Sequence, residues 1–274
     1  MKLLFTLGLN LITFLLFGNV DDKKPKKTAG FASVNYEIFG DDHAFTPIVD
    51  QELKEHVYYI VSGHGGPDPG ANTLVNGNMV AEDEYAYDVS LRLAKNLISH
   101  GAKVYMIVRD ENDGIRDEEY LDVDTDEVVW GGEKIPLNQS QRLRQRTQII
   151  NSLYEENKAK GYEIQRVIET HVDSRYTDHK VDIFFYYNEN KPESKRLAEG
   201  MYETIKTKYD AKQKGRGYNG EVKPRALWTI TASKPPVVFI ELGNITNEYD
   251  RKRLLIPDNR QAIANWFLAG LLDN

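Results

Sequence analysis

The sequence predicts a single α/β domain with a mainly parallel, twisted central sheet and helices on both faces. Two observations lead to this class: short β-rich runs alternate with segments of helical periodicity, and the alternation continues from about residue 57 to about residue 272. The chain has 274 residues, of which 41% are hydrophobic, so it can bury a sizeable core.

The first twenty residues, MKLLFTLGLNLITFLLFGNV, predict a secretory signal peptide, because one lysine precedes an apolar run. The run is shorter than the roughly 20 apolar residues that cross a bilayer, so an uncleaved anchor is the less favoured alternative. No later segment approaches that length, and we expect no membrane span. The protein is therefore expected in the periplasm or outside the cell.

Residues 21–50 mix charges, Pro and Gly without a period, and we expect a linker or an N-terminal arm there. The folded domain then occupies residues 51–274. Within it, five runs rich in β-branched and aromatic residues predict the strands: 57–62, 103–108, 166–170, 181–187 and 236–242.

Apolar residues recur at helical spacing within 84–101 and the pattern stops at Gly101, so a helix is predicted to connect the first two strands. Three further segments predict helices, the last with Asp258 as its N-cap: 138–157, 192–209 and 258–272. Residues 110–136 fit neither pattern and predict a long insertion loop, a kind of segment that often borders a site.

Composition excludes several classes of function. The chain has no cysteine, which excludes disulfides, thiol nucleophiles and cysteine ligands, so a metal site must use His, Asp or Glu. The formal net charge is −7 without a basic cluster on a predicted face, which argues against a nucleic-acid partner and against anionic membrane surfaces.

Three predicted strands run directly into a reactive residue. His64 follows the first strand in the loop GHGGPDPG, His171 lies in RVIETHVDS, and Glu241 lies in VVFIELGN. Ligands of open α/β sheets bind at the carboxyl ends of the strands, so these side chains are expected to meet. The glycine loop lacks the Lys-Ser/Thr pair of a P-loop and the spacing of a dinucleotide fingerprint, which argues against phosphate binding.

Each residue taken alone also has an ordinary structural interpretation. Glu82, Asp83 and Glu84 would be favourable charges in the first turn of a helix. A histidine in a tight turn bonds to backbone, and a glutamate at a strand end accepts loop amides. Together, however, two imidazoles and one carboxylate form a three-ligand zinc set with an open fourth position, and a second carboxylate could move protons for an attacking water.

Residues 57–272 resemble the zinc-dependent N-acetylmuramoyl-L-alanine amidases of bacterial cell-wall turnover, of the division and spore-cortex type. The most specific segment is GHGGPDPGA, and the next is Glu82 followed by a Leu/Ile-rich helix that ends in Gly-Ala-x-Val. The register of that helix favours Glu82 over Glu84 as the family's ligand. Four later matches follow the family's order: Leu143 with Arg146, Asn151, ETHVDS and KPPVVFIELGNITN.

The resemblance implies that His64, Glu82 and His171 hold Zn²⁺, while Glu241 takes a proton from the attacking water and passes it to the leaving amine. The implied substrate is peptidoglycan, cleaved at the amide between the lactyl group of N-acetylmuramic acid and L-alanine of the stem peptide. Arg146 is implied to contact substrate, although a structural ion pair is an equal alternative.

Some positions depart from the family. Val61 and Ser62 stand where Asp-Pro is usual, so a hydrogen-bond acceptor near the metal is either missing or supplied elsewhere. Thr170 and Val172 flank His171 in place of Ile and Ala. His179 is a spare imidazole near the site in sequence, and we expect it at the surface.

Two other functions stay open at this point. One is a catalytically weak wall-binding or regulatory module, which would have no chemical need for Glu241, and the other is a zinc peptidase with a different amide substrate. Placement within the envelope is expected to depend on the catalytic domain, on residues 21–50 or on a regulatory protein partner whose identity the sequence does not give.

Overall fold

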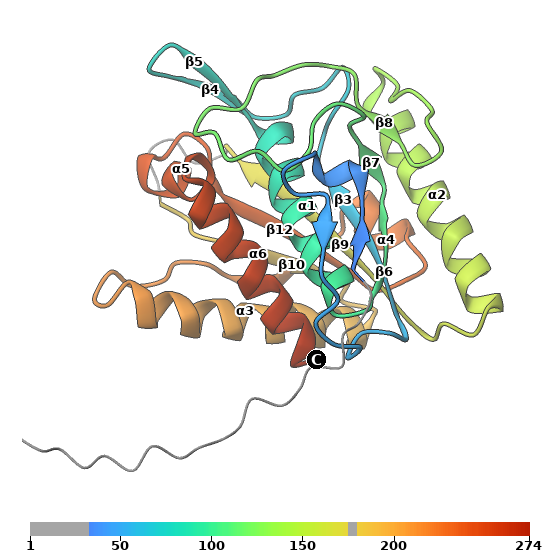
Figure 1. Ribbon diagram of the computed structural model, residues 1–274. Helices are drawn as coiled ribbons and strands as arrows, with labels where there is room; N and C mark the ends of the chain where they lie inside the picture. The colour runs from blue at the N-terminus through green and yellow to red at the C-terminus, as the bar shows by residue number, and fades with distance from the viewer. Residues whose placement is uncertain (1–32, 175–179) are drawn as a thin grey trace, which may run out of the picture. The chain divides into compact units, whose positions relative to one another are not determined.

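A six-stranded sheet with the strand order β11-β10-β12-β9-β3-β6 forms the centre of the computed structural model, which describes residues 33–174 and 180–274 (Figure 1). Its strands are β3 (His56–Ser62), β6 (Lys103–Met106), β9 (Ile164–Asp173), β10 (Phe184–Tyr187), β11 (Val222–Pro224) and β12 (Val237–Asn244). All neighbouring pairs are parallel except β10 with β12. The predicted mainly parallel sheet is confirmed. The predicted signal peptide, residues 21–32 and His179 lie outside the described residues.

Both faces of the central strands are buried, as expected for a parallel sheet covered on two sides. In β3 every residue after His56 is buried, and all eight residues of β12 are buried. Because these strands consist almost entirely of residues such as Val, Ile, Tyr and Phe, their side chains pack against the helices on both faces of the sheet. One apolar cluster lies on each face of the sheet, and the predicted two-sided α/β arrangement follows from them.

The helices divide between the two faces. On one face α1 (Glu82–Ser99), α3 (Pro192–Lys212) and α6 (Pro257–Leu272) pack together, with α1 and α6 running side by side (Figure 1). The other face carries α2 (Gln139–Ala159) and the short α4 (Trp228–Ala232). A further short helix, α5 (Glu248–Leu255), connects β12 to α6. The four predicted helices are therefore all present.

The predicted strand 103–108 is divided in the structure. β6 ends at Met106, and β7 (Val108–Arg109) pairs instead with β8 (Val128–Val129) inside the insertion. The predicted strand 181–187 begins only at Phe184, because Asp182 adopts a left-handed backbone with φ of 58° and interrupts the extended chain.

The prediction that Asp258 caps the last helix is wrong. The helix begins at Pro257, Asp258 lies inside its first turn, and the N-cap position is occupied by Ile256, which makes no side-chain cap. Proline is favoured at the first helical position because its missing N–H would have no intrahelical acceptor there.

A β-hairpin that the sequence analysis did not predict projects from the sheet between β3 and α1 (Figure 1). Its strands are β4 (Asn72–Val75) and β5 (Asn78–Ala81), paired antiparallel around Asn76 and Gly77. Both turn residues have positive φ, 52° and 86°, which is typical of the Asn-Gly turn in two-residue hairpins. The Asn-Gly dipeptide would have allowed this hairpin to be predicted from the sequence.

The described part of the 21–50 segment packs against the domain. β1 (Val34–Asn35) pairs with β2 (Phe45–Thr46) around a 3₁₀ turn, η1 (Glu37–Phe39), and the Phe39 side chain is fully buried in the core. Its carbonyl accepts the amide of Ile115 from the insertion at 3.0 Å. In residues 33–174 and 180–274, none of the helices combines the length and the apolar character needed to traverse a bilayer.

A fully buried ion pair fastens α6 to α1 and to the insertion. Arg260 and Asp88 are both 0% exposed, and Arg260 Nε donates to Asp88 Oδ2 at 2.6 Å. The same guanidinium donates to four main-chain carbonyls, those of Leu254, Leu255, Arg116 and Glu118. One side chain therefore satisfies acceptors from three separate segments.

We expect Arg260→Met to lower the free energy of unfolding by about 2–4 kcal/mol, because the buried carbonyls of Leu254 and Glu118 lose this donor. Asp88 loses one of two counter-charges and keeps Arg92 at 2.7 Å. Urea unfolding measures the change. The matched control is Lys252→Met, since Lys252 pairs with Glu248 at the exposed surface and should cost less than about 1 kcal/mol. Equal effects of the two substitutions would contradict the role given to Arg260.

Candidate metal centre

The loop that follows β3, residues 63–71, turns sharply and presents His64 at the carboxyl end of the strand. We call it the histidine loop. His64 has a φ of 61°, and Gly65 and Gly66 follow with φ of 93° and 62°. Such left-handed conformations are uncommon for residues with a side chain. The Gly65 amide donates to the Asp68 carbonyl at 2.9 Å, which closes the turn.

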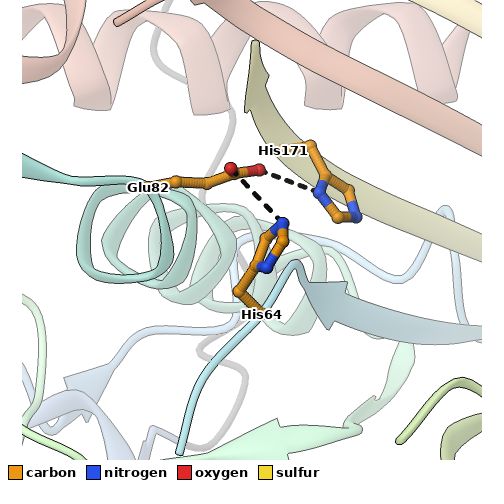
Figure 2. Close-up of side chains that lie close together, drawn as sticks. All are labelled: His64, Glu82 and His171. Atoms are coloured by element: carbon orange, nitrogen blue, oxygen red, sulfur yellow. Dashed lines mark hydrogen bonds and ion pairs between the residues drawn. The ribbon is translucent and has the colours of Figure 1, made fainter. Parts of the chain in front are cut away.

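The Glu82 carboxylate lies between the two predicted histidines (Figure 2). One oxygen, Oε2, is 3.3 Å from His64 Nε2, and the other, Oε1, is 2.9 Å from His171 Nδ1. The same oxygens accept the amides of Ala71 at 2.8 Å and Val172 at 2.9 Å. Glu82 is the first residue of α1, so the helix end is fixed against both loops.

A second carboxylate contacts the far nitrogen of each imidazole. His64 Nδ1 is 2.9 Å from Asp68 Oδ2, and His171 Nε2 is 3.2 Å from Glu169 Oε1. Each histidine therefore has one ring nitrogen facing Glu82 and the other held in place by an acid. This is the arrangement in which outer carboxylates orient metal-binding imidazoles.

Glu169 is one of two residues that supply the hydrogen-bond acceptors which Val61 and Ser62 cannot provide near the metal. Val61 is the register partner of Glu169 across the parallel β3–β9 pair, and Ser62 is the partner of Thr170. The acceptors that positions 61 and 62 lack are thus supplied by Asp68, in the histidine loop, and by Glu169, on the neighbouring strand. Sequence analysis missed both, although Glu169 precedes His171 by two residues and so shares its face of the strand.

Two glycines leave room for the imidazoles. A Cβ atom on Gly63 would lie 2.4 Å from the His171 ring, and one on Gly70 would lie 2.7 Å from both Glu82 Oε2 and the His64 ring. No real Cβ contact is that short. A side chain at either position would push the histidines away from Glu82.

The electrostatics of the site keep it charged in the absence of a metal ion. Burial lowers the pKa of His64, but hydrogen bonds to Asp68 and Glu82 outweigh burial and raise it to about 9. Burial likewise opposes protonation of His171, yet Glu169 and Glu82 raise its pKa to about 10. Burial would raise the pKa of Glu82, and the two imidazoles reverse this and hold it well below its usual range.

The donor set fits a metal ion. One ligand atom from each of His64, Glu82 and His171 lies within 4.8 Å of the others. Nitrogen donors with a carboxylate suit Zn²⁺, and three protein ligands leave a coordination position for water or substrate. Glu84, the alternative to Glu82, is not in this group and pairs instead with Arg116 at 2.9 Å.

Glu241 lies in the same cleft as the three candidate ligands, which has a volume of about 500 Å³. It is the register partner of His171 in the parallel β12–β9 pair and is 7% exposed. Phe239, two residues earlier on β12, stacks on the His171 ring with centroids 4.3 Å apart. The Arg225 guanidinium lies 4.0 Å from Glu241 Oε1, and Trp228, 48% exposed, adds an aromatic ring to the cleft lining.

Arg146 also lines the cleft but is 3% exposed, and its guanidinium donates to the His64 carbonyl. Burial lowers the pKa of Arg146 to about 10. Its contact with substrate stays a prediction, while its bond to the histidine loop is a structural role. One turn earlier on α2, Arg142 donates to Asp68, which links the helix to the carboxylate behind His64.

Comparisons with known proteins point to one enzyme family. A sequence model of the N-acetylmuramoyl-L-alanine amidase family matches residues 59–273. No curated protein sequence matches the chain.

Several solved amidase structures are similar. The CwlD amidase of Clostridioides difficile, in complex with the GerS lipoprotein, is 23% identical with a TM-score of 0.57, covering 80% of this chain and 96% of that chain. AmiC2 of Nostoc punctiforme is 19% identical with a TM-score of 0.55, covering 81% and 97%. Ami1 of Mycobacterium smegmatis is 16% identical with a TM-score of 0.53, covering 79% and 94%. At these identities the likeness concerns the fold.

We expect the chelator-treated protein to lose stability as the pH rises from about 6.5 to about 9.5. Folding raises the pKa of His64 and His171, so their stabilisation is complete below the unfolded value of about 6.5 and is lost as the pH passes through the folded values. Urea unfolding across this range measures the slope. In Glu82→Gln the slope should be smaller, and an unchanged slope would contradict the pairing.

Proposed function

Because the chain belongs to the N-acetylmuramoyl-L-alanine amidase family, we propose that it hydrolyses peptidoglycan at a zinc centre held by His64, Glu82 and His171. Family membership itself gives the chain the activity of an N-acetylmuramoyl-L-alanine amidase, which separates the stem peptide from the glycan. What supports the zinc centre is the convergence of both imidazoles on one carboxylate. The order of residues agrees with the family motif.

A bound Zn²⁺ would supply a Lewis acid that polarises the scissile carbonyl and acidifies water. The chain's own residues do the rest. Asp68 and Glu169 fix the orientation of the two imidazoles, which must be neutral to bind metal. Arg146 and Arg142 hold the histidine loop through the His64 carbonyl and Asp68.

Glu241 is the general base in this proposal. Its carboxylate lies at the carboxyl end of β12 in the wall of the cleft, on the strand next to His171. From there it takes a proton from the attacking water and returns it to the nitrogen of the leaving L-alanine amine. The Arg225 guanidinium lies 4.0 Å from the Oε1 atom of Glu241.

Peptidoglycan lies outside the cytoplasmic membrane, so an amidase of this family acts there. We propose that residues 1–20 direct export and that residues 51–274 form the catalytic domain, with 21–50 as an arm. The CwlD structure contains a lipoprotein, GerS. A regulatory protein partner for the present chain stays a prediction.

Purified muropeptides should be cleaved to free stem peptides that begin with L-alanine, identified by mass spectrometry. We expect Glu241→Gln to bind zinc normally and to be about 10²–10⁴-fold slower, because the amide cannot accept the proton. The matched control is Glu155→Gln, an exposed carboxylate that pairs with Lys234 and does not line the cleft.

Cleavage between two amino acids of the stem would point to a peptidase and overturn the amidase assignment. Full activity of Glu241→Gln would remove Glu241 from the mechanism without affecting that assignment. No hydrolysis by the zinc-loaded parent protein would favour the binding-module alternative.

Removing the acid behind His171 should weaken zinc binding. We expect Glu169→Ala to lower zinc affinity about 10–100-fold and Glu169→Gln to retain part of it, because the amide oxygen can still accept a hydrogen bond. Competition with a zinc indicator measures the affinity. Glu163→Ala, an exposed glutamate just before β9, is the control, and equal affinities in all variants would exclude the orienting role.

A further inference from the structure

Three buried carboxylates lie together beside the N-terminus of α1. They belong to Asp83, Glu84 and Glu127, and one ligand oxygen from each lies within 4.8 Å of the others. We call them the carboxylate cluster. The residues are 2%, 2% and 5% exposed, so water solvates them poorly. Two come from the first turn of α1 and one from the insertion.

The hydrogen bonds of the carboxylate cluster are incomplete. Glu84 uses one oxygen for Arg116 at 2.9 Å and the other for the Asp124 amide at 3.3 Å. Glu127 Oε2 accepts the Gly66 amide at 2.6 Å. Asp83 Oδ1 accepts the Glu84 amide at 3.0 Å, but Asp83 Oδ2 is buried and has no hydrogen-bond partner within residues 33–174 and 180–274.

The charge of the cluster is also unbalanced. Arg116 forms ion pairs with two carboxylates, Glu84 through one terminal nitrogen and Asp113 through the other. Its single positive charge therefore cannot balance both. Asp110 and Asp124, from the same insertion, add further negative charge around Glu84 and Glu127. An uncompensated carboxylate is expensive to bury. A cation in contact with Asp83 and Glu127 would satisfy the open oxygen and balance the charge.

We propose that the carboxylate cluster of Asp83, Glu84 and Glu127 binds a calcium ion. The donors are all oxygens, which hard divalent cations prefer and which distinguishes this cluster from the nitrogen-containing zinc set. Calcium fits better than magnesium, because Mg²⁺ keeps several water ligands and needs regular octahedral geometry. A buried cluster that joins a helix end to a loop instead suits the flexible coordination of Ca²⁺.

The position of Glu127 links this ion to the histidine loop. Its Oε2 holds the Gly66 amide, two residues after His64, and its carboxyl carbon would lie 3.6 Å from a Cβ on Gly65. Calcium would therefore hold the acidic insertion against α1 and support the backbone that carries His64. Within residues 110–127, ten of eighteen residues are Asp or Glu and one is Arg, so this segment gains most from a cation.

A second acidic group in the same insertion, Asp110, Asp124 and Asp126, is the natural comparison. Asp110 Oδ1 accepts the amides of Asn112 and Asp113, and Asp126 accepts from the Asn112 side chain. Asp126 is exposed, and none of the three contributes a buried oxygen without a partner. It therefore provides a matched control rather than a site.

Calorimetric titration of the zinc-loaded protein with CaCl₂ tests the proposal, with thermal unfolding as a second readout. We expect one Ca²⁺ per chain with a dissociation constant on the order of 10⁻⁵–10⁻³ M, and a rise in melting temperature of about 5 °C or more at saturation. MgCl₂ at the same concentration should produce a much smaller shift. Neither readout depends on amidase activity, so failure here would leave the proposed function untouched.

Three variants locate the ion. Asp83→Asn and Glu127→Gln should each lose at least about tenfold in calcium affinity, whereas Asp126→Asn should bind like the parent protein. Circular dichroism without calcium shows whether the variants fold, and if Asp83→Asn does not, Glu127→Gln decides. Absence of binding at millimolar calcium, undiminished binding in Glu127→Gln, or loss of binding in Asp126→Asn would each overturn the proposal.

Discussion

The candidate metal centre depends on one side chain, the Glu82 carboxylate, which holds three separate segments together. Its oxygens face His64 after β3 and His171 in β9, and they accept the amides of Ala71 and Val172. Because α1 begins at Glu82, the helix cannot shift without moving the carboxylate away from both imidazoles. The sheet, the helix and the histidine loop are fixed relative to one another through this contact.

Two pairs of acidic side chains lie around that contact. Their negative charges exceed the positive charges near them, so the region favours cations. Asp68 and Glu169 contact the outer ring nitrogens of the imidazoles, and Asp83 and Glu127 lie beside the N-terminus of α1. The partial positive charge of the α1 N-terminus favours carboxylates there but does not balance them all. In our proposals cations balance these acids: zinc binds where two imidazoles join a carboxylate, and calcium binds where all donors are oxygens.

Long elements with a strong local pattern were predictable, whereas features that depend on pairing with distant residues were not. The strand at 57–62 and the helix within 84–101 follow from apolar spacing alone, because each buries a continuous face. The division of 103–108 into β6 and β7 was not predictable, since it depends on pairing between Val108 and Val129, about twenty residues away along the chain. The position of Asp258 has a different cause. Proline is favoured at the first helical position, so the helix begins at Pro257 and Asp258 falls inside the first turn.

The sequence by itself determined the α/β class and predicted the candidate metal ligands and general base, because strand ends and motif spacing are local properties. His64, Glu82, His171 and Glu241 could all be named from it. Only the tertiary structure decided which acids support them: Glu169 faces His171 and lies across from Val61, and Glu127 reaches Gly66 from a distant loop. Register between strands and contacts of an irregular insertion depend on the packing of the whole chain, and no local pattern encodes them.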